Sequence, residues 1–277
     1  MTGLTPGAAR KALGQHFLFD AALLKRIALA GGPVEGKTVI EVGPGPGGLT
    51  RALLDAGVKK LVAVELDDRF ADGLATWPEA ATGRLHVIRG DAREIDEARL
   101  VKDAGGDLPA MLVANLPYNV GTPLVVKWLK AGAGSREQWR GPMVLMFQKE
   151  VALRICAAPD EDHYGRLAVL AHATMKPRIA MIIPPGAFRP PPKVDSAVVV
   201  LAPLPSDEVF ADLDALENVT SAAFGQRRKM LRSALKALPG GLEALTAAGI
   251  DPTRRAETLT QEEFRRLPAE WQKRRVD

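Results

Sequence analysis

Apolar residues in the first part of the chain form five short runs separated by segments of helical periodicity. The runs are residues 38–42, 61–64, 85–88, 111–114 and 143–147. They do not alternate cleanly between polar and apolar positions, which is the pattern of strands covered on both faces. The segments between them, such as 48–56 and 122–129, carry apolar residues at helical spacing. Alternating strands and helices predict an α/β fold with a doubly wound parallel sheet.

The pattern changes towards the C-terminus. Residues 196–204 read as one further, longer strand, which together with the region 169–183 would form an antiparallel edge, although the strand order stays open. After Pro205 we expect only helices, at 209–224, 228–238, 241–248 and 261–267. Thr260, with Glu263 three residues later, is the signature of a capping box. The sequence therefore predicts two domains, residues 1–205 and a smaller helical domain at 206–277.

Composition narrows the class of protein. Charged residues make up 25% of the 277 residues and apolar residues 47%, as in ordinary globular proteins. No apolar run is long enough for a transmembrane helix, and residues 1–10 lack the hydrophobic region of a secretory signal peptide. A single cysteine excludes an intramolecular disulfide, and the four histidines have no metal-ligand spacing. We expect a cytoplasmic, monomeric protein without a metal site.

Positive charge is concentrated near the C-terminus. The net charge is +4, yet residues 221–277 hold 12 basic and 7 acidic residues. The excess lies mainly in Arg227, Arg228, Lys229 and Arg232, and no acid occurs between residues 218 and 242. A single-signed run of this kind fits either a solvated helix face or a polyanion partner such as RNA.

A glycine-rich turn follows the first strand. Gly43, Gly45 and Gly48 match the dinucleotide fingerprint G-x-G-x-x-G, which on its own is a weak signal. The intervening Pro44 and Pro46 lack the N–H groups that a pyrophosphate needs. Glu41, just before the turn, disfavours phosphate and favours a cation.

Three polar side chains end successive strands of the predicted sheet. Glu65 stands where an acid can accept both ribose hydroxyls, and Asp91 is placed to accept from an adenine amino group. Asn115 follows the next apolar run. A ligand with adenine, ribose and a positive centre, but no phosphates, fits this set. S-adenosylmethionine is such a ligand, whereas NAD and ATP are not.

The segment Asn115-Leu116-Pro117-Tyr118 would hold the acceptor of the methyl group. The Asn115 side-chain oxygen and the Leu116 carbonyl can accept hydrogens from a base amine and orient it. Pro117 favours an extended Leu116 and so directs that carbonyl. Tyr118 would stack on the unstacked base.

These motifs together resemble the ribosomal RNA adenine dimethyltransferase family, and within it the bacterial small-subunit branch. The resemblance extends over roughly residues 13–260 and is carried by LGQHFL (13–18), EVGPG (41–45), ELD (65–67), GDA (90–92), NLPY (115–118), QKEV (148–151), YGRL (164–167), FRPPPKVDS (188–196) and FGQRRK (224–229). It implies a Rossmann-like class I methyltransferase sheet with a smaller all-helical C-terminal domain that binds RNA. It also implies dimethylation of N6 on two adjacent adenines in a hairpin near the 3′ end of small-subunit RNA, within a pre-30S particle.

The resemblance also assigns residues. The cofactor contacts that it implies, with their neighbours in the same motifs, are His16, Leu18, Gly43, Gly45, Glu65, Asp91, Ala92 and Asn115. The family often has asparagine in place of His16, so a side-chain contact there would differ while a backbone contact would survive. Phe188 would cover the target base opposite Tyr118, and the neighbouring Arg189 and Lys193 are plausible phosphate contacts.

Two other functions remain open. One is methylation of adenine in large-subunit RNA, of the antibiotic-resistance type, which has a similar fold and similar motifs; a DNA adenine methyltransferase is more remote. The other is a ribosome-assembly or transcription factor that has kept the fold without the chemistry. The motif at residues 224–229 and the stretch 250–257 favour the small-subunit branch. The complete set of acids and amides argues against a non-catalytic protein.

Overall fold

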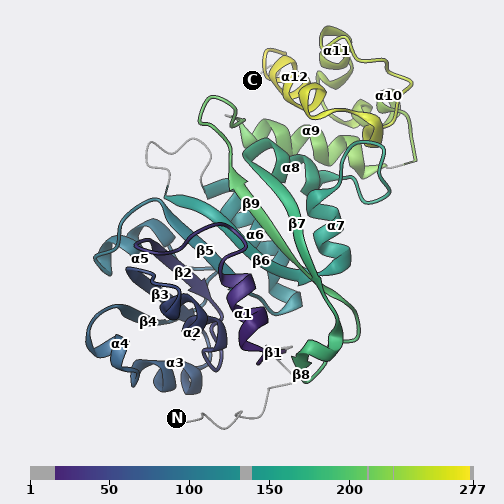
Figure 1. The fold of residues 1–277 in the computed structure, drawn as a ribbon. Helices are drawn as coiled ribbons and strands as arrows, with labels where there is room; N and C mark the ends of the chain where they lie inside the picture. The colour runs from purple at the N-terminus through teal and green to yellow at the C-terminus, as the bar shows by residue number, and fades with distance from the viewer. Residues whose placement is uncertain (1–15, 132–138, 211, 227, 275–277) are drawn as a thin grey trace. The chain divides into compact units, whose positions relative to one another are not determined.

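The chain forms two compact units in a computed structural model (Figure 1). The structure describes residues 16–131, 139–210, 212–226 and 228–274, with the side chains of Tyr118 and Asn119 excepted. Unit 1 consists of residues 1–128, 137–152 and 178–203, and unit 2 of residues 129–136, 153–177 and 204–277.

A seven-stranded sheet forms the centre of unit 1, in the order β4-β3-β2-β5-β6-β9-β7. Its strands are β2 (Thr38–Val42), β3 (Lys60–Glu65), β4 (Leu85–Arg89), β5 (Ala110–Asn115), β6 (Arg140–Gln148), β7 (Met175–Ile183) and β9 (Ser196–Pro203). The first five pair in parallel, and β9 pairs antiparallel with β6. The strand order reverses between β2 and β5, so the loops after these two strands border the crevice where such sheets bind ligands.

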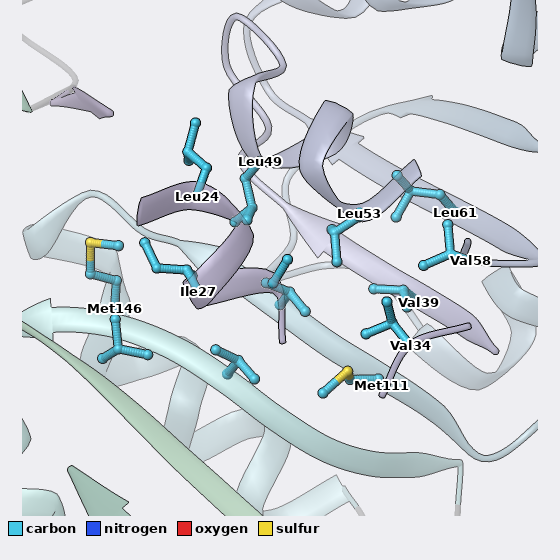
Figure 2. Packing of buried hydrophobic residues seen from close by; sticks show 14 of the residues in the cluster. Leu24, Ile27, Val34, Val39, Leu49, Leu53, Val58, Leu61, Met111 and Met146 are labelled. Carbon is cyan, nitrogen blue, oxygen red and sulfur yellow. The ribbon is translucent and has the colours of Figure 1, made fainter. Parts of the chain in front are cut away.

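Helices α1 (Ala21–Ala28) and α2 (Gly48–Asp55) cover one face of this sheet. Figure 2 shows Leu24 and Ile27 of α1 and Leu53 of α2 over the strand residues Val39 and Met111. These side chains belong to one buried cluster, and each such burial contributes about 1.5–3 kcal/mol before entropy is counted.

The remaining helices of unit 1 lie in the connections between strands. They are α3 (Asp68–Ala75), α4 (Pro78–Ala81), α5 (Glu97–Asp103) and most of α6 (Tyr118–Ala131), while α7 (Lys149–Cys156) follows β6 and has its second half in unit 2. A separate two-stranded sheet pairs β1 (Phe17–Leu18) with β8 (Phe188–Arg189), antiparallel. All five predicted parallel strands and the late antiparallel strand are confirmed. The region 169–183 divides into the end of α8 (Arg166–Thr174) and the edge strand β7.

Unit 2 is built from helices around an aromatic cluster. Besides α8 these are α9 (Leu213–Gly225), α10 (Leu231–Ala234), α11 (Gly241–Ala247) and α12 (Gln261–Gln272). Tyr164 is fully buried, packs edge-on against Phe224 with 6.1 Å between ring centroids, and donates from its hydroxyl to the Leu259 carbonyl at 3.0 Å. The predicted capping box of Thr260 and Glu263 at the start of α12 is confirmed.

The single predicted boundary near residue 205 differs from the observed division. Pro203 does end one stretch of unit 1, but residues 153–177 cluster with the C-terminal helices. The reason is the packing of α8 side chains, such as Ala168 and Val169, in the same buried cluster as Leu216 of α9. Their apolar spacing resembles that of other helices in the chain, so it does not indicate which core they join.

Two helices also differ in extent from the sequence prediction. The helix expected at 209–224 begins at Leu213, because the side chain of Asp212 caps it by accepting from the Ala215 amide at 2.8 Å. The helix expected at 228–238 is the short α10 followed by a 3-10 turn at residues 235–237. Within the described ranges, every helix is too short or too polar to cross a lipid bilayer.

Candidate active site

The turn between β2 and α2 has a backbone path that requires glycine. Gly43, Gly45 and Gly47 have φ of 71°, 54° and 87°, in the left-handed region that side chains disfavour. A Cβ on Gly45 would lie 2.8 Å from the Phe17 ring, and one on Gly47 would lie 2.7 Å from the Trp77 ring. The sequence fingerprint includes Gly48, which begins α2, whereas the left-handed N-cap is Gly47.

Glu65, at the end of β3, is fixed by backbone amides on both sides. Its Oε2 accepts from the Gly45 amide and its Oε1 from the Asp67 amide, each at 2.8 Å. The side chain is 6% exposed, and burial raises its pKa although the amides of Asp67 and Gly45 oppose the shift. Because each carboxylate oxygen has a second lone pair, the fixed group can still accept hydrogen bonds from a ligand.

Asp91, after β4, has a basic partner that the sequence analysis missed. The Arg93 guanidinium donates to both carboxylate oxygens, with Nε at 2.9 Å and Nη2 at 2.5 Å from Oδ2. Hydrogen bonds from the Arg93 side chain, then from its amide, lower the pKa of Asp91. A close pair two residues apart has no clear sequence signal, because it depends on how the loop turns.

A cavity joins these groups on the side of the sheet that bears α6. Its walls are apolar, from Val42 and Val64 in the strands to Leu124 in α6, and its rim carries Glu65 and Asp91. The further lining residues are Gly43, Leu66, Gly90, Ala92, Arg93, Leu116, Pro117 and Val120. An apolar slot with a few acceptors at its rim suits a flat ring that carries a sugar.

Asn115 ends β5 beside this cavity and contacts the segment before β1. Its Nδ2 donates to the His16 carbonyl at 3.3 Å, while the His16 ring, through Nδ1, bonds the Pro190 carbonyl at 2.8 Å. The link from His16 to the site is therefore made by its backbone, which an asparagine at this position would preserve. A second, smaller cavity is lined by Asn115, Gly43 and Leu18 and lies on the α1 and α2 side of the sheet.

Lys127 of α6 holds the loop that carries Asp91, a role that the sequence did not indicate. Its Nζ donates to the Ala92 carbonyl at 2.8 Å, to the Ile95 carbonyl, and to Glu97 Oε1 at 2.7 Å. The same Glu97 oxygen accepts from the Trp128 indole at 2.7 Å. This partly buried ion pair thereby holds the loop that contributes Ala92 to the lining of the cavity.

Other predicted site residues are placed less directly. Phe188 is 1% exposed within the core cluster and pairs with Leu18 across the β1–β8 ladder, so in this arrangement its ring does not face a base. Pro117 lines the first cavity, but the side chain of Tyr118 lies outside the described part of the structure. Arg189 and Lys193 are exposed.

The predicted basic cluster belongs to unit 2. Arg228 and Lys229 are exposed just after α9, and Arg232 is exposed in α10. The start of α10 is held by backbone bonds from Leu231 to the Arg254 carbonyl at 2.7 Å and from Arg232 to the Pro252 carbonyl at 3.0 Å. Arg227 lies outside the described residues.

Comparison with known proteins gives consistent matches along the chain. The profile of the family described as ribosomal RNA adenine dimethylase matches residues 7–273. A ribosomal RNA small subunit methyltransferase A from Sinorhizobium fredii is 53% identical over 262 residues, which covers 94% of this chain and 84% of that protein. The crystal structure of a dimethyladenosine transferase from Plasmodium falciparum is similar with a TM-score of 0.79 and 25% identity, covering 94% of this chain and 98% of that one. The 23S rRNA methyltransferase ErmE shares the fold, with a TM-score of 0.68 at 22% identity, covering 92% and 99% of the two chains.

Proposed function

Because the chain belongs to the ribosomal RNA adenine dimethylase family, we propose that it transfers methyl groups from S-adenosylmethionine to N6 of adenines in small-subunit ribosomal RNA. Its first unit has the Rossmann-like fold of class I methyltransferases. The observation that carries the proposal is that Gly43 lines both cavities, the larger of which is also lined by Glu65 and Asp91 and the smaller by Asn115.

The residues of the first cavity fit the nucleoside end of S-adenosylmethionine. Glu65 accepts hydrogen bonds from the ribose hydroxyls, and Asp91 accepts from the adenine amine beside its Arg93 partner. Val42, Leu66 and Leu116 exclude water from the faces of the ring. The Gly43 turn, with its proline neighbours, provides few donors for a phosphate, which fits a ligand without one.

The residues after β5 position the adenine amine that accepts the methyl group. When bound, S-adenosylmethionine supplies a methyl group already activated by the sulfonium charge. The Asn115 amide already donates from Nδ2 to the His16 carbonyl, so its Oδ1 is the atom that accepts an N6 hydrogen. The Leu116 carbonyl accepts the second hydrogen, and these two bonds orient the nitrogen lone pair. Tyr118 stacks on the base, and a matching role for Phe188 requires the β1–β8 pair to open.

Finer features of the reaction belong to the same proposal. The substrate is a pair of adjacent adenines in a hairpin near the 3′ end of small-subunit RNA, presented by a pre-30S particle in the cytoplasm. The protein acts as a monomer, with Arg189 and Lys193 in unit 1 and Arg228, Lys229 and Arg232 in unit 2 contacting phosphates. Exposed basic side chains of this kind supply the salt-dependent part of RNA affinity.

The alternatives make different predictions for one experiment. Small subunits from a methylation-deficient strain are incubated with the protein and S-adenosylmethionine, and the RNA is then mapped by mass spectrometry. Two neighbouring adenines, each heavier by two methyl groups, are expected in the 3′-terminal hairpin. Modification of naked large-subunit RNA alone would support the antibiotic-resistance type. Cofactor binding without modification of either RNA would support an assembly factor.

A further inference from the structure

Glu41 is a buried acid that the proposed reaction has not yet used. It lies in β2, is 1% exposed, and points to the same face of the sheet as Val39, the face covered by α1 and α2. Within the described part of the chain, its Oε2 has no hydrogen-bond partner, and neither has the hydroxyl of Thr50 in α2. A buried polar group without a partner usually costs about 1–3 kcal/mol, so its presence needs an explanation.

The smaller cavity beside Glu41 offers no charge to balance it. Apart from Glu41 and Asn115, the lining residues that the structure describes are apolar side chains, glycines and prolines. This cavity meets the larger one at Gly43, and Asn115 borders it where the transferred methyl group must be presented. A small space with an acid on its wall and no cation suits a ligand that brings its own positive charge.

Among the residues that the structure describes, the charged neighbours of Glu41 are acids. Glu65 on β3 lies close enough to act on it, and Asp67 beyond it is already paired with Arg69 at 2.6 Å. Thr50 on α2 and Asn115 on β5 are neutral, and α1 contributes Leu24. Burial raises the pKa of Glu41 to about 8 and the Glu65 charge adds to the rise, while the Thr50 hydroxyl, which is near Glu41 but outside hydrogen-bonding geometry, opposes it. At pH 7 in the ligand-free protein this carboxyl is therefore mostly neutral.

We propose that Glu41 distinguishes the cationic cofactor from its neutral thioether product by ionising when the sulfonium binds and taking up a proton when that charge is gone. This inference rests on the proposed function. On binding, the carboxyl O–H bond breaks and the proton passes to solvent, and the carboxylate then faces the sulfonium. Once the methyl group has left, the product carries one positive charge fewer and a solvent proton returns to Glu41.

The physical basis is the low polarity of the site. Two opposite charges a few ångströms apart in a buried site attract far more strongly than in water, and an isolated buried carboxylate is costly. S-adenosylmethionine provides the compensating charge and S-adenosylhomocysteine does not. Glu41 thus favours the substrate form of the cofactor and weakens product binding.

The experiment is isothermal titration of the full chain with each ligand in two buffers that differ in ionisation enthalpy. At pH 7 the wild-type protein should release up to about 0.9 proton with S-adenosylmethionine and markedly less with S-adenosylhomocysteine. Affinity for S-adenosylmethionine should rise nearly tenfold per pH unit from pH 6 to 7 and level off above pH 8. Glu41→Gln should remove both the extra proton release and the difference in pH dependence. The wild type and Glu41→Gln bind the same ligand. Any proton that the ligand's ammonium group releases is therefore the same for both and cancels when their proton release is compared.

Equal proton release by the wild type and Glu41→Gln would overturn the inference. Should the variant not fold, carbon-13 NMR of the wild-type carboxyl is decisive, because its pKa must fall with S-adenosylmethionine and not with S-adenosylhomocysteine. Glu243→Gln, an exposed site in α11, is the matched control and should behave as the wild type. Binding without proton release would reject the role of Glu41 alone, whereas no binding at any pH would also reject the proposed function.

Discussion

The side-chain amide of Asn115 donates from Nδ2 to the backbone carbonyl of His16 at 3.3 Å, joining two residues 99 positions apart. This bond determines how the amide is oriented. With the NH₂ group engaged, Oδ1 is the end of the amide that can accept a further hydrogen bond, and an acceptor is what a base amine needs. The bond also ties the end of β5 to the segment before β1, so one contact joins two parts of the proposed site.

Replacing Asn115 by alanine should separate binding from chemistry. Loss of one orienting acceptor typically costs about 100- to 1,000-fold in rate, while Glu65 and Asp91 still hold the nucleoside. We expect single-turnover methylation of small subunits to fall by that factor and the Kd of S-adenosylmethionine to change by less than about tenfold. Asn218→Ala, an exposed site in α9, is the control. Full activity of Asn115→Ala would remove Asn115 from the mechanism.

Glu65→Gln should weaken the cofactor site itself. The carboxylate accepts from the Gly45 and Asp67 amides at once, and an amide side chain must turn its NH₂ group towards one of them. Loss of a charge-assisted hydrogen bond costs about 1.5–3 kcal/mol, so the Kd of S-adenosylmethionine should rise at least tenfold by calorimetry. Glu243→Gln should leave it unchanged. A threefold effect or less would show that Glu65 has no direct role.

Lys127→Met tests the anchor of the Asp91 loop. Glu97 is 4% exposed, so removing its partner leaves a buried charge and should destabilise the protein by about 3 kcal/mol in urea unfolding. In the double variant Lys127→Met/Glu97→Gln the charge is gone and much of the stability should return. Affinity for S-adenosylmethionine should stay reduced in both, because the Ala92 carbonyl has lost its donor. Wild-type affinity in the double variant would contradict the anchoring role.

The raised pKa of Glu41 also predicts a pH-dependent stability without any ligand. Its ordinary value is 4.5 and its folded value about 8, so the folded state binds the proton more tightly. The stabilisation is complete below pH 4.5 and is lost as the pH rises to about 8. The unfolding free energy of the wild type relative to Glu41→Gln should therefore fall by a few kcal/mol between pH 5 and 8.5. If the unfolding free energies of the two proteins changed with pH by equal amounts, Glu41 would have no raised pKa in the folded protein.

Neutralising the basic cluster should affect RNA and not the cofactor. We expect glutamine at Arg228, Lys229 and Arg232 to weaken RNA binding and to reduce the slope of log K against log salt by about 2–3. Affinity for S-adenosylmethionine should not change. The charge-matched control is a triple variant with glutamine at Lys37, Lys59 and Arg99. Lys37 and Lys59 directly precede β2 and β3, so they lie at the amino ends of these strands, whereas the proposed site lies at the carboxyl ends. Equal salt slopes for the two triple variants would exclude a specific role of the cluster.

The sheet of unit 1 was predictable because strands buried on both faces must be apolar throughout. The runs that became β2 and β5 carry that pattern unambiguously, and each ends in a polar or glycine-rich segment at the carboxyl edge. That Glu65, Asp91 and Asn115 lie at the carboxyl ends of strands along one edge of the sheet follows from parallel pairing alone. The roles of Arg93 as partner of Asp91 and of Lys127 as donor to the Ala92 carbonyl were not predictable, because these hydrogen bonds depend on the paths of loops and the positions of helices.

The sequence by itself determined the order of strands and helices, the glycine turn and the acids and amide at the strand ends. These features depend only on the spacing of residues within one strand or helix and the turn that follows it. Only the tertiary structure decided which core residues 153–177 would join, which end of the Asn115 amide is bonded to His16, and that Glu41 is buried with no partner for its Oε2 among the described residues. Each of these depends on groups brought together from distant parts of the chain. Burial and hydrogen-bond partners are properties of the packed molecule, and a carboxyl has an unusual pKa only after packing has removed its water.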